Sequence, residues 1–332
     1  MQELRNIENK INIWELPPGY SKESKLNYLN VDFAGNKFDC MVNYTKKMVN
    51  TSFEDISKIG DTFTYLHEIK GKWECETFED IPYLIPYEVE NSEIAVIVLS
   101  GGGFIYKTID GDASGGKSIA DRLNKNGISA YLLHYRSNPY NFPIPMLDIQ
   151  RAIRYLRYHN KDNKYYKNDK IYAMGFSAGA YVVSSFVNQY MNKDVLSSEF
   201  IDYKKDEIDD IDDSISKAAF IYPQLTFNYH LPMLSSVLND DKIDTEEKRA
   251  KLLEKFHLAD NLSNEDVWQF VAYGNSDIVI PQESVEEYIK RLKQKGGNIS
   301  QIFLPGEGHG FSDDLYIDEF VKWLKSKLLK KW

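Results

Sequence analysis

The sequence predicts an α/β fold, in which a mostly parallel central sheet is flanked by helices. From about residue 82 onward, short apolar runs alternate with stretches of helical periodicity, as in chains that build parallel sheets. The run Glu93–Leu99 (EIAVIVL) is nearly continuously apolar, which suits a strand buried on both faces. Glycine-rich turns follow several of these stretches and mark their ends.

The first half of this pattern contains three strands and two helices. An apolar and aromatic run over 83–89 indicates a strand, and the run over 93–99 indicates a second one. A helix is expected over 113–124, because a glycine closes it shortly afterwards, and the run ISAYLLH over 128–134 indicates the third strand. Apolar residues then recur at roughly helical spacing over 143–159, which indicates the second helix.

The second half continues the alternation to the end of the chain. Short apolar runs indicate strands over 170–174, 218–222, 268–273 and 299–304. Helices are expected over 178–190, 283–295 and 314–330, the last with apolar residues on one side. No internal repeat is found, so the pattern favours one continuous α/β domain.

Two regions fall outside this alternation. Residues 1–80 are polar and aromatic, show no clean period and contain no run of regular strands. We expect them to form an N-terminal extension, which is an arm, part of a cap or an extra layer, and we place the main domain at 81–332. The highly charged segment 193–265, with a helix expected over 246–256, is predicted to be an insertion that forms a cap.

Composition narrows the classes of function. The 332 residues include 40 Lys and Arg against 50 Asp and Glu, and the net charge of −10 disfavours nucleic-acid binding. Hydrophobic residues make up 42%, enough for a large core. We find no apolar run of about 18 residues and no secretory signal, and the two cysteines are too few for a disulfide framework. We therefore expect a cytoplasmic protein, compatible with a homo-oligomer and without a membrane span.

A serine in a tight turn is the first candidate for chemistry. The segment Gly175–Gly179 (GFSAG) matches G-x-S-x-G and lies between an expected strand and an expected helix, the setting of a nucleophile elbow. Small residues two positions to either side avoid clashes in such a turn, and the helix N-terminus stabilises negative charge near the serine. Ser177 is therefore the predicted nucleophile.

A serine nucleophile needs a base and a carboxylate that orients the base. Of the six histidines, His309 stands in a glycine-flanked turn directly after an expected strand. Asp277 stands just past the strand expected over 268–273 and is the predicted acid, with Glu307 as its main rival. The chain order Ser177, Asp277, His309 is the order of α/β-hydrolases.

A glycine-rich turn supplies candidate oxyanion donors. Ser100–Phe104 (SGGGF) follows an expected strand, and its glycines let backbone N–H groups point at a developing oxyanion. The N–H of Ala178, next to the predicted nucleophile, adds a donor. The turn matches neither G-x-G-x-x-G nor G-x-x-x-x-G-K-[ST], which disfavours nucleotide binding. Acyl transfer at such a site needs neither a metal nor an organic cofactor.

Six motifs together resemble those of the α/β-hydrolase serine esterases of the hormone-sensitive-lipase-like and acetyl-esterase type, which are grouped with feruloyl and acetyl-xylan esterases. The motifs are SGGGF at 100, YRxxP at 135, FPxPxxD at 142, GFSAG at 175, YGNSD at 273 and GEGHGF at 306. The resemblance covers about residues 82–332. It implies the α/β-hydrolase fold, with Ser177 as nucleophile, His309 as base and Asp277 as orienting acid.

The same resemblance implies further roles. Oxyanion donors would come from Gly102, Gly103 and Ala178, and Arg136 and Asp148 would fasten loops near the site. One departure from the family stands at Ser100, where these esterases usually carry a histidine. Because a serine hydrogen-bonds with less reach, this change bears on the rigidity of the oxyanion loop and on substrate preference.

We expect hydrolysis of a small-molecule carboxylic ester through an acyl-enzyme, with activity falling at acid pH as His309 becomes protonated. Aromatic and apolar residues after the strand over 218–222 suit a small acyl group, such as acetyl, on a sugar or another small alcohol. Predicted substrate contacts are Phe104, Phe176, Tyr229 and His230. Packing within the cap is the alternative interpretation of the residues after that strand.

Two other functions stay open from the sequence. A peptidase of the prolyl-oligopeptidase type shares the fold and the triad order, but about 80 N-terminal residues are too few for a propeller. A non-catalytic relative would use the pocket to bind a ligand. Ser100 is the feature in favour of this second alternative, and the presence of all three triad candidates counts against it.

Overall fold

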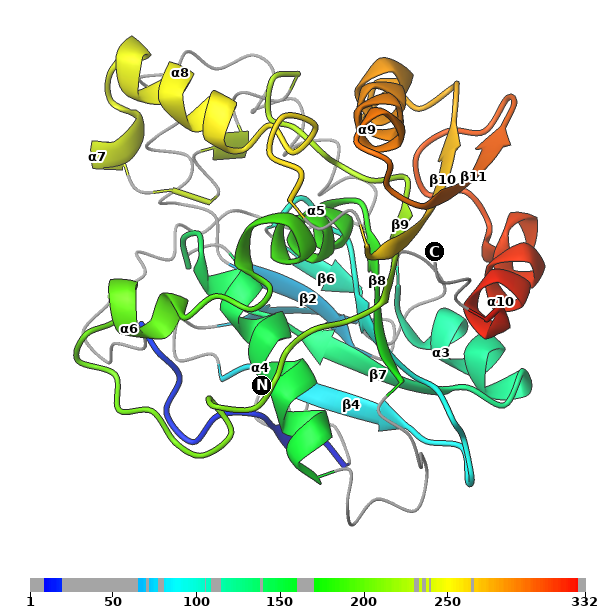
Figure 1. Cartoon of the computed structure of the whole chain (residues 1–332), viewed down its shortest axis with the longest axis horizontal. Helices are drawn as coiled ribbons and strands as arrows, with labels where there is room; N and C mark the ends of the chain where they lie inside the picture. The colour runs from blue at the N-terminus through cyan, green and yellow to red at the C-terminus, as the bar shows by residue number, and fades with distance from the viewer. Residues whose placement is uncertain are drawn as a thin grey trace.

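A computed structural model gives the structure of the protein. It describes residues 9–19, 65–69, 72–76, 81–104, 106–108, 115–137, 140–159, 170–229, 233–234, 237–238, 240–263 and 266–327. Among these residues, an eight-stranded sheet lies between two layers of helices, and three further strands form a second sheet (Figure 1).

The eight-stranded sheet has the order β1-β4-β7-β5-β8-β9-β10-β11. All neighbours from β7 to β11 are parallel, whereas β4 pairs antiparallel with both β1 and β7 at one edge. The strands are β1 Ile11–Asn12, β4 Tyr83–Tyr87, β5 Ala95–Leu99, β7 Ser129–His134, β8 Ile171–Phe176, β9 Lys217–Ile221, β10 Trp268–Gly274 and β11 Ile299–Leu304. The predicted mostly parallel sheet is confirmed, and it brings the carboxyl ends of its parallel strands to one edge.

Helices cover both faces of this sheet, as Figure 1 shows. The helices are α3 Lys117–Lys125, α4 Ile144–His159, α5 Ala178–Ser185, α9 Gln282–Gln294 and α10 Ile317–Lys325. Side chains of α4, α5 and α9 join one buried cluster, and those of α3 and α10 join the cluster on the opposite face. Helix α10 buries Phe320 and Leu324, one turn apart, as its predicted apolar side requires.

Two expected helices differ in their details. The helix expected over 178–190 is α5 followed by a five-residue π-helix, Phe186–Tyr190. The helix expected over 314–330 is a short 3₁₀ helix, Asp313–Leu315, followed by α10, and its last three residues lie outside the described part of the chain. The other expected elements of the main domain have counterparts whose ends differ by a few residues.

The prediction that residues 1–80 contain no regular strands is wrong. Strands β2 (Tyr65–Ile69) and β3 (Lys72–Glu76) form an antiparallel pair, and β2 also pairs in parallel with β6 (Tyr106–Thr108). The sequence KWECE of β3 alternates strictly between polar and apolar residues, and only Lys70-Gly71 separates it from β2. These two features are the usual signal of a hairpin, and the sequence analysis missed them.

The N-terminal segment 9–19 is fastened to helix α4. Ile13 and Trp14 are buried in the core, and Arg151 of α4 donates through Nε to the carbonyl oxygen of Ile13 over 2.8 Å. The Arg151 guanidinium also lies 4.6 Å from the centre of the Trp14 ring, a cation–π distance. This segment is therefore part of the packed domain.

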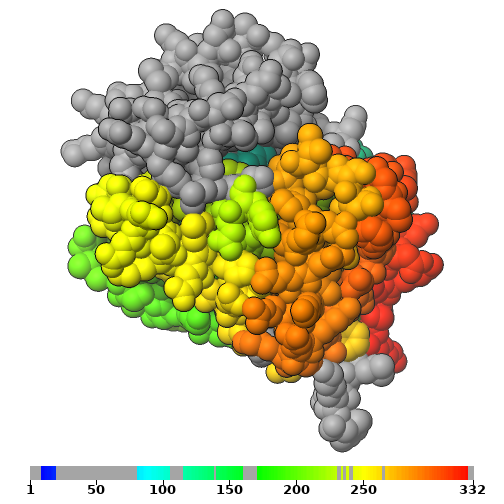
Figure 2. Space-filling view, turned by 90° about the horizontal axis from the view of Figure 1, so that it is seen from above, coloured from blue at the N-terminus to red at the C-terminus, as the bar shows by residue number. Residues whose placement is uncertain are grey.

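The predicted insertion over 193–265 contains helices α6 (Val195–Glu199), α7 (Asp240–Ile243) and α8 (Glu246–Lys255), besides strand β9. Thr245 accepts a hydrogen bond from the backbone N–H of Lys248 and so caps α8. Figure 2 shows the segment after β9, in yellow-green, between the α7–α8 segment, in yellow, and helix α9, in orange. The helix expected over 246–256 is confirmed, and the role of the segment as a cap stays a prediction.

Lys217 ties helix α10 to the sheet. Its side chain is fully buried, and Nζ donates to the carbonyl oxygens of Trp323, Leu324 and Ser326 over 2.7, 2.9 and 2.7 Å. Such carbonyl groups at a helix C-terminus have no partner within the helix. Burial lowers the pKa of Lys217 to about 8.

Candidate active site

Ser177 lies in a tight turn between β8 and α5. Its φ of +50° is in the left-handed region, which is strained for a residue other than glycine. A Cβ atom on Gly175 would lie 2.4 Å from the carbonyl oxygen of Gly179, and one on Gly179 would lie 2.4 Å from the carbonyl oxygens of Leu99 and Ser100. Both glycines of the motif are thus required by close backbone contacts, and together they hold Ser177 at the carboxyl edge of the sheet.

The structure brings Ser177, His309 and Asp277 into one hydrogen-bonded line. The Nε2 atom of His309 is 2.9 Å from Oγ of Ser177, and its Nδ1 atom is 2.9 Å from Oδ2 of Asp277. The other carboxylate oxygen of Asp277 accepts hydrogen bonds from the N–H groups of Val279 and Ile280, each over 2.8 Å. An ionised carboxylate only accepts hydrogen bonds, so Nδ1 carries the proton and Nε2 is left to accept the serine hydroxyl proton.

The loops that carry the acid and the histidine are joined by their backbones. The N–H of Ser276 donates to the carbonyl oxygen of Glu307 over 2.9 Å, and the N–H of Gly306 donates to the side chain of Asn275 over 2.7 Å. A Cβ atom on Gly274 would lie 2.2 Å from the carbonyl oxygen of Glu307. Glu307, the rival acid, therefore contributes its backbone to this contact, while Asp277 reaches the imidazole.

The glycine-rich turn after β5 approaches Ser177 closely. A Cβ atom on Gly101 would lie 3.0 Å from the Cβ of Ser177, so this residue, which the sequence analysis did not select, sets the approach of the turn. Gly102, Gly103 and Phe104 follow with φ values of +123°, +62° and +66°. Ala178 opens helix α5, where the first N–H groups have no partner within the helix.

A buried ion pair supports this turn from below. Tyr135 donates its hydroxyl to the carbonyl oxygen of Ser100 over 2.9 Å. The next residue, Arg136, is fully buried and meets the buried carboxylate of Asp148 through Nε and through Nη2 at 2.6 Å, while its Nη1 donates to the carbonyl oxygen of Pro18. These contacts link the N-terminal segment and α4 to the base of the turn.

The BD-FAE family model matches residues 82–292, which is more than half of the chain. The chain belongs to the BD-FAE family. Ser177 and Asp277 fall within the matched residues, and His309 lies beyond their end.

Several solved structures with the same fold are named as ester hydrolases. An acetyl ester-xyloside bifunctional hydrolase from Caldicellulosiruptor lactoaceticus is 24% identical over 74% of this chain and 86% of its own, with a TM-score of 0.59. Propionate-bound esterase Est2 from Thermogutta terrifontis is 18% identical over 74% and 88%, with a TM-score of 0.55. Carboxylesterase Cest-2923 from Lactobacillus plantarum is 16% identical over 68% and 79%, with a TM-score of 0.54. No curated protein matches. These likenesses show the α/β-hydrolase fold for this BD-FAE chain.

The predicted substrate contacts of this BD-FAE protein lie in different surroundings. Phe104 and Phe176 are almost fully buried, whereas Tyr229, beyond β9, is 52% exposed. The ring of Phe104 packs against Phe142 and other aromatic rings, and Phe176 packs against Tyr222. His230 lies outside the described residues. Substrate contact by these residues stays a prediction.

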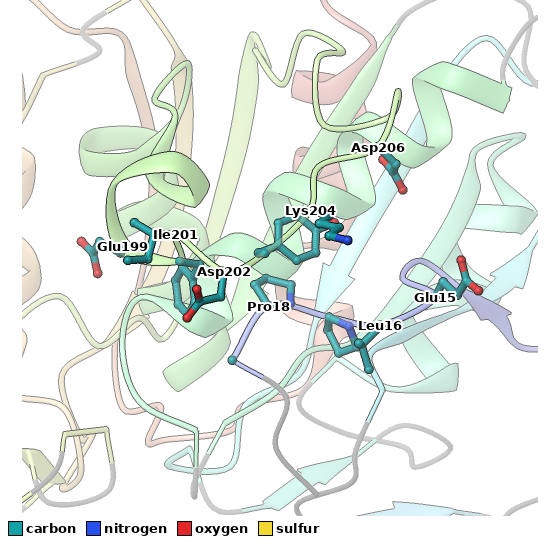
Figure 3. Close-up of a pocket in the computed structure, with 12 residues that line it drawn as sticks. Glu15, Leu16, Pro18, Glu199, Ile201, Asp202, Lys204 and Asp206 are labelled. Atoms are coloured by element: carbon teal, nitrogen blue, oxygen red, sulfur yellow. The ribbon is translucent and has the colours of Figure 1, made fainter.

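The structure also holds a cavity of about 650 Å³ beside the N-terminal segment (Figure 3). The N-terminal segment 15–19, the end of α6 and the loop after it line the cavity, with acidic residues at Glu15, Glu199, Asp202 and Asp206. None of the three residues of the line contributes to its wall. Over the described part of the chain, no cluster of three or more His, Cys, Asp and Glu residues could hold a metal, and no helix is long and apolar enough to cross a membrane.

Tyr222, just beyond β9, also lies at the site, although the sequence did not single it out. The centre of its ring lies 4.9 Å from that of His309. The available signal was an aromatic residue at the carboxyl end of an expected strand, at the edge where the other site residues gather.

Proposed function

We propose that this BD-FAE protein is a serine esterase that cleaves carboxylic esters with short acyl groups. The observation that carries the proposal is the hydrogen-bonded line from Asp277 through His309 to Ser177, with 2.9 Å at both contacts of the imidazole. Distances of this size are those of a nucleophile paired with its base and of a base paired with its orienting group.

In the first half of the reaction, Oγ of Ser177 attacks the ester carbonyl while Nε2 of His309 takes the hydroxyl proton. The tetrahedral intermediate collapses to an acyl-serine, and His309 gives the proton to the leaving alcohol. In the second half, His309 takes a proton from water, the hydroxide attacks the acyl-serine, and Ser177 recovers its proton as the acid leaves. Asp277 stabilises the imidazolium that forms in both halves.

Backbone groups of the turn after β5 and of α5 would hold the oxyanion. The proposed donors are the N–H groups of Gly102, Gly103 and Ala178. The close approach of Gly101 to Ser177 supports this assignment, because it sets the turn directly beside the attacking atom. Oxyanion donors of this kind contribute roughly 3 to 4 kcal/mol each to the stabilisation of the transition state.

The packing behind the turn supports a short acyl group. Phe104 contacts Phe142, Tyr181 and Phe227 at centroid distances of 5.6 to 6.1 Å, and all four rings are buried. Packed rings fill the space next to Gly103, and we propose that they leave room for a short acyl chain only. The names of two similar structures, an acetyl ester hydrolase and a propionate-bound esterase, agree with small acyl groups. We propose an ester of acetate or propionate with a sugar or another small alcohol, and contact of the alcohol with the exposed Tyr229.

Hydrolysis of 4-nitrophenyl acetate, butyrate and octanoate by the wild type and by Ser177→Ala tests this function. We expect kcat/KM to fall by about 100-fold or more from acetate to octanoate, and Ser177→Ala to lose turnover of all three esters. Comparable turnover of acetate and octanoate would contradict the short acyl group. Undiminished turnover by Ser177→Ala would contradict the serine mechanism.

A further inference from the structure

Tyr222 lies against the imidazole ring of His309. The two ring centres are 4.9 Å apart with an angle of 63° between the planes, and Tyr222 also meets Phe311, two residues after His309, at 5.0 Å. Tyr222 is only 1% exposed. Its ring therefore forms a wall of the space in which the imidazole sits.

The backbone holds Tyr222 in an unusual conformation. Its φ of +35° is uncommon for a residue with a bulky side chain, and its N–H donates to the carbonyl oxygen of Ala272 in β10 over 2.8 Å. Such strain persists only where the surrounding structure enforces it, and it gathers at functional sites. Here the strained residue directs its ring at the predicted base.

A second set of contacts supports the wall from behind. The ring of Phe311 packs edge-on against Tyr316 at 5.8 Å, and Tyr316 donates its hydroxyl to Asp313. Ser118 of α3 donates to the other oxygen of Asp313 over 3.1 Å. Tyr222 and Phe311 thus belong to a cluster that reaches the helical layer formed by α3 and α10.

The loop that carries His309 needs such support. Gly308 and Gly310 flank the histidine, and Gly310 has a φ of +77°, so the local backbone restrains the ring little. The hydrogen bond to Asp277 fixes one edge of the ring. During the second half of the proposed reaction Oγ of Ser177 carries the acyl group, so the hydrogen bond between Ser177 and the imidazole is missing and only a water molecule faces Nε2. A rigid aromatic wall then limits rotation about the remaining bond.

We propose that Tyr222 is a positioning residue for His309, which keeps Nε2 directed at Ser177 while Nδ1 stays on Asp277. The inference rests on the proposed esterase function. A displacement of a catalytic group by about 1 Å can cost about 100-fold in rate, so the loss of the ring should reduce kcat far more than substrate affinity. Phenylalanine in place of Tyr222 keeps the ring and should therefore preserve most of the wild-type kcat.

Four variants test this role with 4-nitrophenyl acetate. For Tyr222→Leu and Tyr222→Met we expect kcat to fall about 10- to 100-fold with KM changed by less than about threefold, and for Tyr222→Phe we expect kcat within about fivefold of the wild type. Tyr222→Met fills similar space without a planar ring. A loss of kcat in both variants is therefore not explained by a packing defect in Tyr222→Leu alone. The matched control is Tyr288→Leu, since Tyr288 is also fully buried and packs edge-on against Phe220 in β9, away from His309.

The outcomes separate the two proposals. Each kcat is calculated per folded molecule. If the wild type hydrolyses the ester, and Tyr222→Leu and Tyr222→Met both have the same kcat as Tyr288→Leu, then Tyr222 does not position His309. A loss in Tyr222→Phe as large as in Tyr222→Leu would also overturn the role of the ring. If the folded wild type neither hydrolyses the ester nor reacts with a fluorophosphonate at Ser177, the esterase function itself fails.

Discussion

The replacement Asp277→Asn tests the catalytic geometry most sharply, because the structure dictates how the new amide must point. In the wild type, one carboxylate oxygen accepts from the N–H groups of Val279 and Ile280, and the other accepts from His309. The oxygen of the introduced amide must take the side of the two backbone donors, since an NH₂ group there would face two N–H groups. The NH₂ group is then forced toward Nδ1 of His309.

This arrangement reverses the tautomer of the imidazole. Nδ1 must accept from the amide, so the proton moves to Nε2, which can no longer accept the proton of Ser177. Loss of the charge-assisted hydrogen bond alone should raise the activation free energy by roughly 1.5 to 3 kcal/mol, which lowers kcat about 10- to 150-fold. The wrong tautomer takes the expected loss in kcat to about 10⁴-fold, or about 5.5 kcal/mol.

The assay is the steady-state hydrolysis of 4-nitrophenyl acetate, with thermal unfolding to verify that each variant is folded. Glu307→Gln is the matched control, because Glu307 is the other carboxylate near the histidine in sequence, and we expect it to keep kcat within about threefold of the wild type. Retention of more than a tenth of the wild-type kcat in Asp277→Asn would refute the reasoning. An equal loss in Glu307→Gln would move the orienting role to that residue.

Three further results are expected. Asp148→Ala leaves the guanidinium of Arg136 buried without its carboxylate and should lower the free energy of unfolding by about 3 to 5 kcal/mol in urea titrations; a loss below about 1 kcal/mol would contradict this. Gly179→Ala places a Cβ atom against two backbone carbonyl groups and should cost about 1 to 3 kcal/mol or more by the same measurement, whereas unchanged stability would contradict the close contact. Burial lowers the pKa of Lys217 to about 8, so between this pH and the usual lysine range the unfolded chain binds more protons than the folded one. The free energy of unfolding of the wild type, relative to that of Lys217→Met, should therefore rise from pH 7.5 to 9.5. A constant or falling difference would contradict the lowered pKa.

The strand–helix alternation and the hydrogen-bonded line could be predicted because their signals are local. Gly175 and Gly179 mark the turn around Ser177, since any larger residue would clash with neighbouring backbone. Asp277 and His309 each follow an apolar strand, and parallel strands bring such positions to the same edge. The order of the motifs along the chain was therefore enough to name the candidates.

The parts that the sequence did not reveal depend on contacts between distant segments. Tyr222 meets His309 only because β9, β10 and β11 are neighbours in the sheet, and no local pattern connects positions 87 residues apart. The burial of Phe104, a predicted substrate contact, among aromatic rings follows from the path of the chain beyond β9. The pair of β2 and β3 was missed for a different reason, because its alternation was present but short.

The most direct test of the central claim is to locate the site of covalent reaction. The folded wild type is treated with a fluorophosphonate, and the modified residue is mapped by mass spectrometry beside Ser177→Ala. We expect a single adduct on Ser177 that is absent from the variant and accompanies complete loss of esterase activity. An absence of any adduct in active wild type, or an adduct on another residue such as Ser100, would contradict it.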